Sequence, residues 1–97
     1  MELERVAERF AAIASGVEAH QQNAALMRLF SEAAAACQRA VGEASGDTRR
    51  LLTNVATALD TWRQVWPRLG AQTEFRAAVA REAGFWAKRF ARRESDG

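Results

Sequence analysis

Several residue types that catalytic sites, disulfides and export signals depend on are scarce in this chain of 97 residues. It has one cysteine, one histidine, one proline and no tyrosine. A single cysteine, Cys37, excludes an intrachain disulfide. No apolar run approaches the ~20 residues that span a membrane, and the opening MELERVAERF is too charged for a secretory signal. These absences predict a cytoplasmic protein with no membrane span.

The motifs of common catalytic and metal sites are also missing. The chain has no glycine-rich phosphate loop, no Cys-x-x-Cys pair and neither His-Glu-x-x-His nor Glu-x-x-His. His20 and Cys37 lie seventeen residues apart, so a metal site would need carboxylates for almost all its ligands. We therefore expect no enzyme activity, no catalytic residue, no metal and no cofactor. Cys37 stands in an alanine-rich stretch, where a free cysteine is typically a small buried apolar residue.

The residues that are abundant favour helices. The sequence contains 22 alanines, five phenylalanines and three tryptophans, and it lacks the apolar–polar alternation of strands. The prediction is an all-α fold in a single domain covering residues 1–97. Thirteen arginines against one lysine are typical of a GC-rich bacterial genome.

The first half of the chain has a helical apolar period. From Leu3 to Val41 apolar or small residues recur at steps of three or four, which predicts one long helix over about residues 2–41, ended by Gly42. The apolar face changes direction between residues 20 and 24, however. The alternative is a short loop at HQQN, with Asn23 capping a second helix.

The second half begins after the turn GEASGD. A second helix is predicted over about residues 47–66, ended by Pro67 because the residue before a proline is pushed out of helical geometry. A third helix is predicted over about residues 72–92, with Trp86 and Phe90 on its buried face. Residues 93–97 are expected to fray.

These elements predict a long antiparallel helical hairpin whose return arm breaks at Pro67, giving three helices. The alternative is a four-helix bundle. In the hairpin, Phe30 lies opposite Leu59, and His20 occupies a seam position facing the elbow after Trp66. We expect a ring N–H of His20 to bond to the elbow backbone, where Pro67 and the helix end free carbonyls, or the ring to contact Trp66 or Leu69.

One apolar flank of the first helix has no partner in the hairpin. Leu26 and Leu29 are assigned to this outer flank, and exposed apolar stripes commonly mark an interface. A symmetric homodimer that covers them, forming a helical bundle, is the prediction.

The charges are distributed unevenly. Residues 1–46 carry four arginines against six glutamates, whereas residues 47–97 carry ten cations against six acids. On the last helix the residues Arg81, Phe85, Lys88 and Arg92 form one stripe at steps of 4, 3 and 4. This stripe either solvates a helix end or docks a partner or an anionic surface.

Two functions fit these features. The first is a small helical protein–protein interaction module, an adaptor or accessory subunit that self-associates. The alternative is a nucleic-acid-binding accessory protein that uses the basic last helix.

Overall fold

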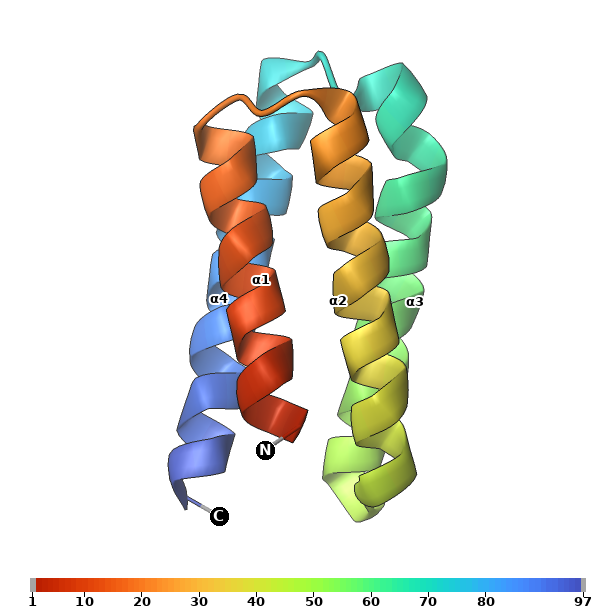
Figure 1. Ribbon diagram of the computed structural model, residues 1–97, viewed down its shortest axis with the longest axis vertical. Helices are drawn as coiled ribbons and strands as arrows, with labels where there is room; N and C mark the ends of the chain where they lie inside the picture. Colours follow the sequence, from red (N-terminus) through yellow and green to blue (C-terminus); the bar gives the residue numbers. More distant parts are fainter. Residues whose placement is uncertain (1, 97) are drawn as a thin grey trace.

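A computed structural model describes residues 2–96, with side chains described for residues 2–92. The four helices are α1 (Glu2–Glu18), α2 (Asn23–Glu43), α3 (Gly46–Leu69) and α4 (Thr73–Asp96). They run alternately up and down, so that the start of α1 and the end of α4 lie at the same end of the bundle (Figure 1). The all-α prediction is confirmed, and of its two forms the four-helix alternative matches the helix count within residues 2–96.

The long helix predicted over residues 2–41 is wrong, because α1 stops at Glu18. The N–H of His20 bonds to the carbonyl of Val17, and that of Gln21 bonds to the carbonyl of Gly16. His20 has a φ of 56°, in the left-handed region. These features make the Schellman motif that ends many helices, with histidine where glycine is usual. The chain then turns back, and α1 packs beside α2.

Pro67 does not end α3, contrary to the prediction, since the helix continues to Leu69. Proline removes one helical hydrogen bond, yet the next turn still closes when the N–H of Gly70 bonds to the carbonyl of Trp66 at 2.8 Å. A Cβ atom on Gly70 would lie 2.8 Å from the indole of Trp66. The residue after the helix is therefore a glycine, because the carbonyl and ring of Trp66 leave no room for a side chain there.

The end of α4 also differs from expectation. The helix runs to Asp96, through all but the last residue of the tail that was predicted to fray. Gly97 lies outside the described residues.

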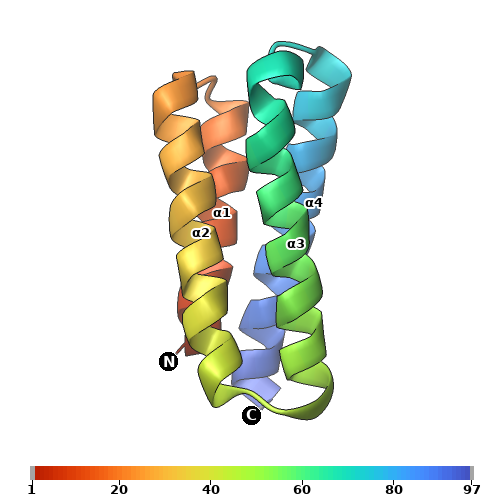
Figure 2. The ribbon, with the colours of Figure 1, turned by 90° about the vertical axis from the view of Figure 1, so that its right-hand side faces the viewer.

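The bundle consists of two close helix pairs. Helix α1 packs against α4, and α2 packs against α3 and, less extensively, against α1 (Figure 2). Three fully buried or nearly fully buried alanines of α2, at positions 33, 36 and 40, leave the neighbouring helices room to approach. Large side chains from all four helices fill the centre.

Aromatic rings connect the two pairs. Phe10 of α1 meets Trp62 of α3 edge-on at 6.5 Å and stacks with Phe90 of α4 at 6.2 Å. Phe30 of α2 contacts Trp62 and Trp66, with ring centroids 6.1 and 5.2 Å apart. The core is therefore one continuous cluster that involves all four helices.

Candidate interaction surfaces

The stripe predicted on the last helix lies on the outside of the bundle. Arg81, Phe85, Lys88 and Arg92 are all exposed, and we call them the α4 stripe. Phe85 is 53% exposed, and no other large hydrophobic side chain among the described residues is exposed. Its ring meets that of Trp86 edge-on at 5.0 Å. Trp86 is half-buried, and Phe90 is fully buried, as expected of the core face.

Within the residues whose side chains are described, the cations of the α4 stripe have no internal partner. Within the described part of the chain, Arg81, Lys88 and Arg92 make no ion pair and no hydrogen bond through their side chains. The arginines that do pair lie on other surfaces. Arg9, for example, donates to Glu32 at 2.9 Å and joins α1 to α2. The α4 stripe therefore combines unpaired positive charge with an exposed aromatic ring.

The self-association flank predicted at Leu26 and Leu29 is not an outer surface. Leu26 is fully buried, and Leu29 is half-buried against the core. Both pack on α1, since a Cβ atom on Gly16 would lie 2.9 Å from Cδ1 of Leu29 and 3.1 Å from Cδ2 of Leu26. The prediction is wrong because α1 folds back beside α2 and covers the flank that a continuous helix would have exposed.

His20 does not occupy a buried seam. It is exposed in the turn between α1 and α2, and its ring forms no hydrogen bond in the part of the chain that the structure describes. The polar contact to Trp66 comes from Asn23, whose Oδ1 accepts a hydrogen bond from the indole N–H at 3.2 Å. The sequence identified Asn23 only as a cap of the second helix, and that prediction is wrong, because α2 begins at Asn23 and its N-cap is Gln22.

Arg76 is the residue at this end of the bundle that the sequence did not indicate. Its guanidinium donates to the carbonyls of Gly70 at 2.7 Å and Val17 at 3.1 Å. It also lies 5.4 Å from the ring centroid of Trp66. These carbonyls belong to the C-terminal ends of α3 and α1, where the helix dipole favours a cation. Arg76 thus joins α4 to the C-terminal ends of α3 and α1 and has a structural role.

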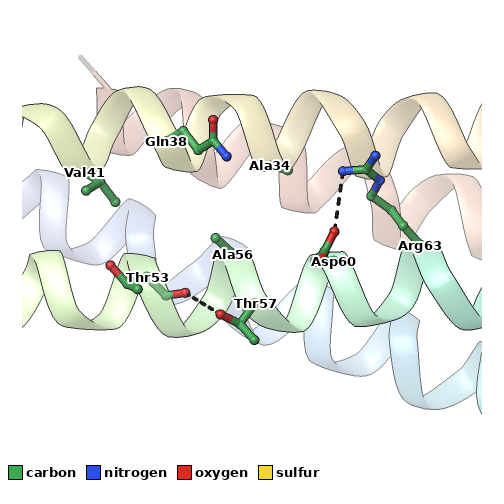
Figure 3. A pocket seen from close by; sticks show the side chains of 8 residues that line it. All are labelled: Ala34, Gln38, Val41, Thr53, Ala56, Thr57, Asp60 and Arg63. Atoms are coloured by element: carbon green, nitrogen blue, oxygen red, sulfur yellow. Dashed lines mark hydrogen bonds and ion pairs between the residues drawn. The ribbon is translucent and has the colours of Figure 1, made fainter.

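A shallow groove lies on the outer side of α2 and α3 (Figure 3). It has a volume of about 490 Å³ and is lined by Ala34, Gln38, Val41, Thr53, Ala56, Thr57, Asp60 and Arg63. The Thr57 hydroxyl donates to the carbonyl of Thr53 at 3.1 Å. Arg63 lies 3.8 Å from Asp60. Because all the polar side chains of the groove except Gln38 already have partners, the groove does not point to a ligand.

Cys37 is fully buried in the core, as the sequence predicted. Burial raises the pKa of its thiol from the ordinary 9.0 to about 12, because the apolar surroundings disfavour the thiolate. A thiol held in its neutral form is a poor nucleophile.

We expect the folded protein to react with a thiol reagent at pH 8 at less than about one hundredth of the rate in denaturant. Stability should also fall as the pH rises above about 9, since the thiol then ionises in the unfolded chain and not in the folded one. The absorbance of the chromophore that the thiol reagent releases measures the reaction rate. Urea unfolding at pH 8 and pH 10 measures the change in stability. Cys37→Ala is the control for the pH effect, which that variant should lack. Equal reaction rates in both states would contradict the burial of the thiol.

Neither a metal centre nor a membrane span is found among the described residues. No three side chains of the metal-ligating types His, Cys, Asp and Glu come together there. No helix there is long and apolar enough to cross a membrane. Comparison of the chain with protein-family models, with curated proteins and with solved structures finds no match.

Proposed function

We propose that the protein is a small helical protein–protein interaction module, an adaptor or accessory subunit, that also self-associates in a bacterial cytoplasm. The observation that carries this proposal is the α4 stripe, in which Phe85 is 53% exposed beside three cations with no internal partner among the described residues. A large aromatic side chain left in water is unfavourable, and aromatic and arginine side chains are enriched where proteins bind each other.

The rest of the described molecule also supports binding over catalysis. Apart from Gln38, the polar side chains of the α2–α3 groove are paired with each other or with helical carbonyls. The thiol of Cys37 is buried and held neutral. What these residues offer a partner is shape, charge and apolar contact.

A second candidate function, nucleic-acid binding, is favoured by the same cations. Arg81, Lys88 and Arg92 follow one helix with Phe85 between them. Such an arrangement could contact phosphates while the ring stacks on a base, for roughly 1–3 kcal/mol. Glu82 is also exposed on this helix and would repel a polyanion. We therefore prefer a protein partner.

A charge-reversed variant, Arg81→Glu with Arg92→Glu, tests whether the α4 stripe binds another molecule or is only a solvated helix face. If the α4 stripe docks a partner, this variant should bind a protein that copurifies with the native chain at least ~10-fold more weakly, with its helical content and melting temperature nearly unchanged. Circular dichroism and titration calorimetry measure these quantities. Glu43→Lys is the control for a change of charge on another helix, since Glu43 is exposed on α2.

Retention on heparin distinguishes the candidates. Nucleic-acid binding predicts retention that is lost at modest salt and in the charge-reversed variant, because phosphate contacts are salt-sensitive. An interaction module predicts concentration-dependent mass without such retention. Unaltered binding of every partner in the variant would leave the α4 stripe as a solvated helix face.

A further inference from the structure

The outer surface formed by α1 and α4 carries acids on one helix and bases on the other. On α1, the flank that meets α2 is identified by contacts of Glu2, Arg9 and Gly16, which follow at intervals of seven residues. A helix turns 100° per residue, so residues two positions after these three point about 200° away from α2. They lie on the outer surface of α1, on the side next to α4. Three exposed residues, Glu4, Ala11 and Glu18, make this row, and exposed Glu8 and Ser15 lie next to it.

Contacts at the start of α4 orient that helix in the same way. Phe75 lies on Trp66 of α3, with ring centroids 5.6 Å apart, and Arg76 reaches the Val17 carbonyl of α1. One further step of 100° places Ala77 on the outer surface beside α1. The row that starts at Ala77 continues through Gly84 and Ala91, and Arg81 and Lys88 lie alongside it.

Acids and bases lie at matching heights on the two helices. Val17 is level with Arg76, and Phe10 is level with Phe90. The two contacts differ in register by seven residues, and a register midway between them brings Glu8 and Glu4 to about the heights of Lys88 and Arg92. The same register places Glu18 within about three residues, or ~4 Å along the helix axis, of the height of Arg81. Within the described residues none of these six side chains forms an ion pair. All six charges are available to another molecule.

From this pattern we infer that a second copy of the chain binds across the α1–α4 face, with a two-fold axis parallel to the helices. This inference rests on the self-association proposed above. The axis places α1 of each protomer over α4 of its partner, so that Glu8 lies opposite Lys88 and Glu18 opposite Arg81. A two-fold axis across the helices would instead place α1 over α1, with acids facing acids. Charge complementarity therefore selects the first arrangement.

The size and side chains of the face suit this dimer. The bundle measures 37 × 21 × 19 Å, so one side offers a footprint approaching the roughly 800 Å² per partner of a standard interface. The residues between the charges are small (Ala11, Ser15, Ala77, Gly84 and Ala91), which lets helices approach within about 8 Å. Rim ion pairs fix orientation more than affinity. The dimer should therefore be weak and should weaken further in salt.

Charge reversal tests the arrangement. We expect Glu8→Lys and Lys88→Glu each to raise the dimer Kd at least ~10-fold at low salt, because each change acts twice in a symmetric dimer. Combining the two changes should restore the Kd to within ~3-fold of the original. Sedimentation equilibrium measures the Kd, and circular dichroism checks folding. Glu43→Lys, on exposed α2 surface, is the matched control and should leave the Kd unchanged.

Cross-linking tests the direction of the axis. Ala11→Cys and Gly84→Cys proteins are prepared separately and mixed under mild oxidation. A Cβ atom on Gly84 meets nothing within 4 Å, so the new side chain is tolerated. The native Cys37 is buried and should not form a disulfide under these conditions. The mixed disulfide should form faster than either symmetric one, whereas a faster Ala11→Cys symmetric disulfide would overturn the proposed axis.

The possible outcomes separate this inference from the interaction-module proposal. A strict monomer at high concentration, with partner binding through the α4 stripe intact, overturns the dimer and leaves the module. If the protein dimerises but neither charge reversal changes the Kd, the dimer does not form through the α1–α4 face. The proposal that the protein self-associates would still hold. Rescue by the double reversal, together with the mixed disulfide, supports the face and the axis.

Discussion

Replacing Phe10 with alanine is expected to lower the free energy of unfolding by about 3–5 kcal/mol. Phe10 is fully buried and contacts rings on two other helices, Trp62 on α3 and Phe90 on α4. Truncation removes apolar burial and leaves a cavity where the two helix pairs meet, which the surrounding helices can fill only in part. A domain of this size typically has about 5–15 kcal/mol of stability, so a large fraction would be lost.

Phe85→Ala is the matched control, because it removes the same side chain from an exposed position. Its cost should stay within about 0.5 kcal/mol, apart from the edge contact with Trp86. Urea unfolding followed by circular dichroism measures both variants. Equal losses of stability in the two would contradict the placement of Phe10 at the centre of the core.

The core was largely predictable from helical periodicity alone. Leu52, Val55, Leu59, Trp62 and Trp66 recur at steps of three or four, and all five are buried on one face of α3. Apolar period depends only on the sequence and on the 3.6-residue turn, so it survives errors in topology. For the same reason the wheel placed the α4 stripe correctly on the outside of its helix.

The end of α1 was not predictable in the same way. Glycine is the usual residue at the left-handed position of a Schellman motif, and here His20 occupies it with a φ of 56°. Histidine gives no comparable signal in the sequence. The period of three and four also continued across the turn, which favoured a continuous helix.

That single error caused the error at the dimer flank. With a continuous helix, Leu26 and Leu29 would face away from the return arm. With α1 folded back, they pack over Gly16 instead. From the sequence alone, Gly16 indicates only the cost of about 1 kcal/mol in propensity that a glycine has in the middle of a helix. Its close contact with α2 depends on tertiary structure.

Arg76 shows a different limit of sequence reasoning. Its neighbours Gly70 and Val17 lie 6 and 59 residues away along the chain. The helical period places Arg76, unlike Arg81, beside the buried positions Val79, Ala80 and Ala83, but it does not identify the carbonyls that the guanidinium contacts. Only the arrangement of the two helix ends does so.

The last prediction concerns Arg76→Met, which should lower the free energy of unfolding by about 2–3 kcal/mol. Methionine keeps much of the side-chain volume but donates no hydrogen bond. The partly buried carbonyls of Gly70 and Val17 would lose a charged donor, for which hydrogen bonds contribute about 1.5–3 kcal/mol. The contact with the Trp66 ring would lose its cation as well.

Two further variants test whether the loss of stability in Arg76→Met comes from the specific contacts of the Arg76 guanidinium. Arg81→Met removes the same charge from an exposed position with no partner in the described part of the chain, and should change stability by less than about 0.5 kcal/mol. Arg76→Lys should recover only part of the loss, because one ammonium cannot match the planar guanidinium that reaches two separated carbonyls and also lies over a ring. Urea unfolding measures all three variants. If Arg76→Met and Arg81→Met cost the same, Arg76 contributes no more than a surface charge, and the link between α4 and the ends of α1 and α3 is not stabilising.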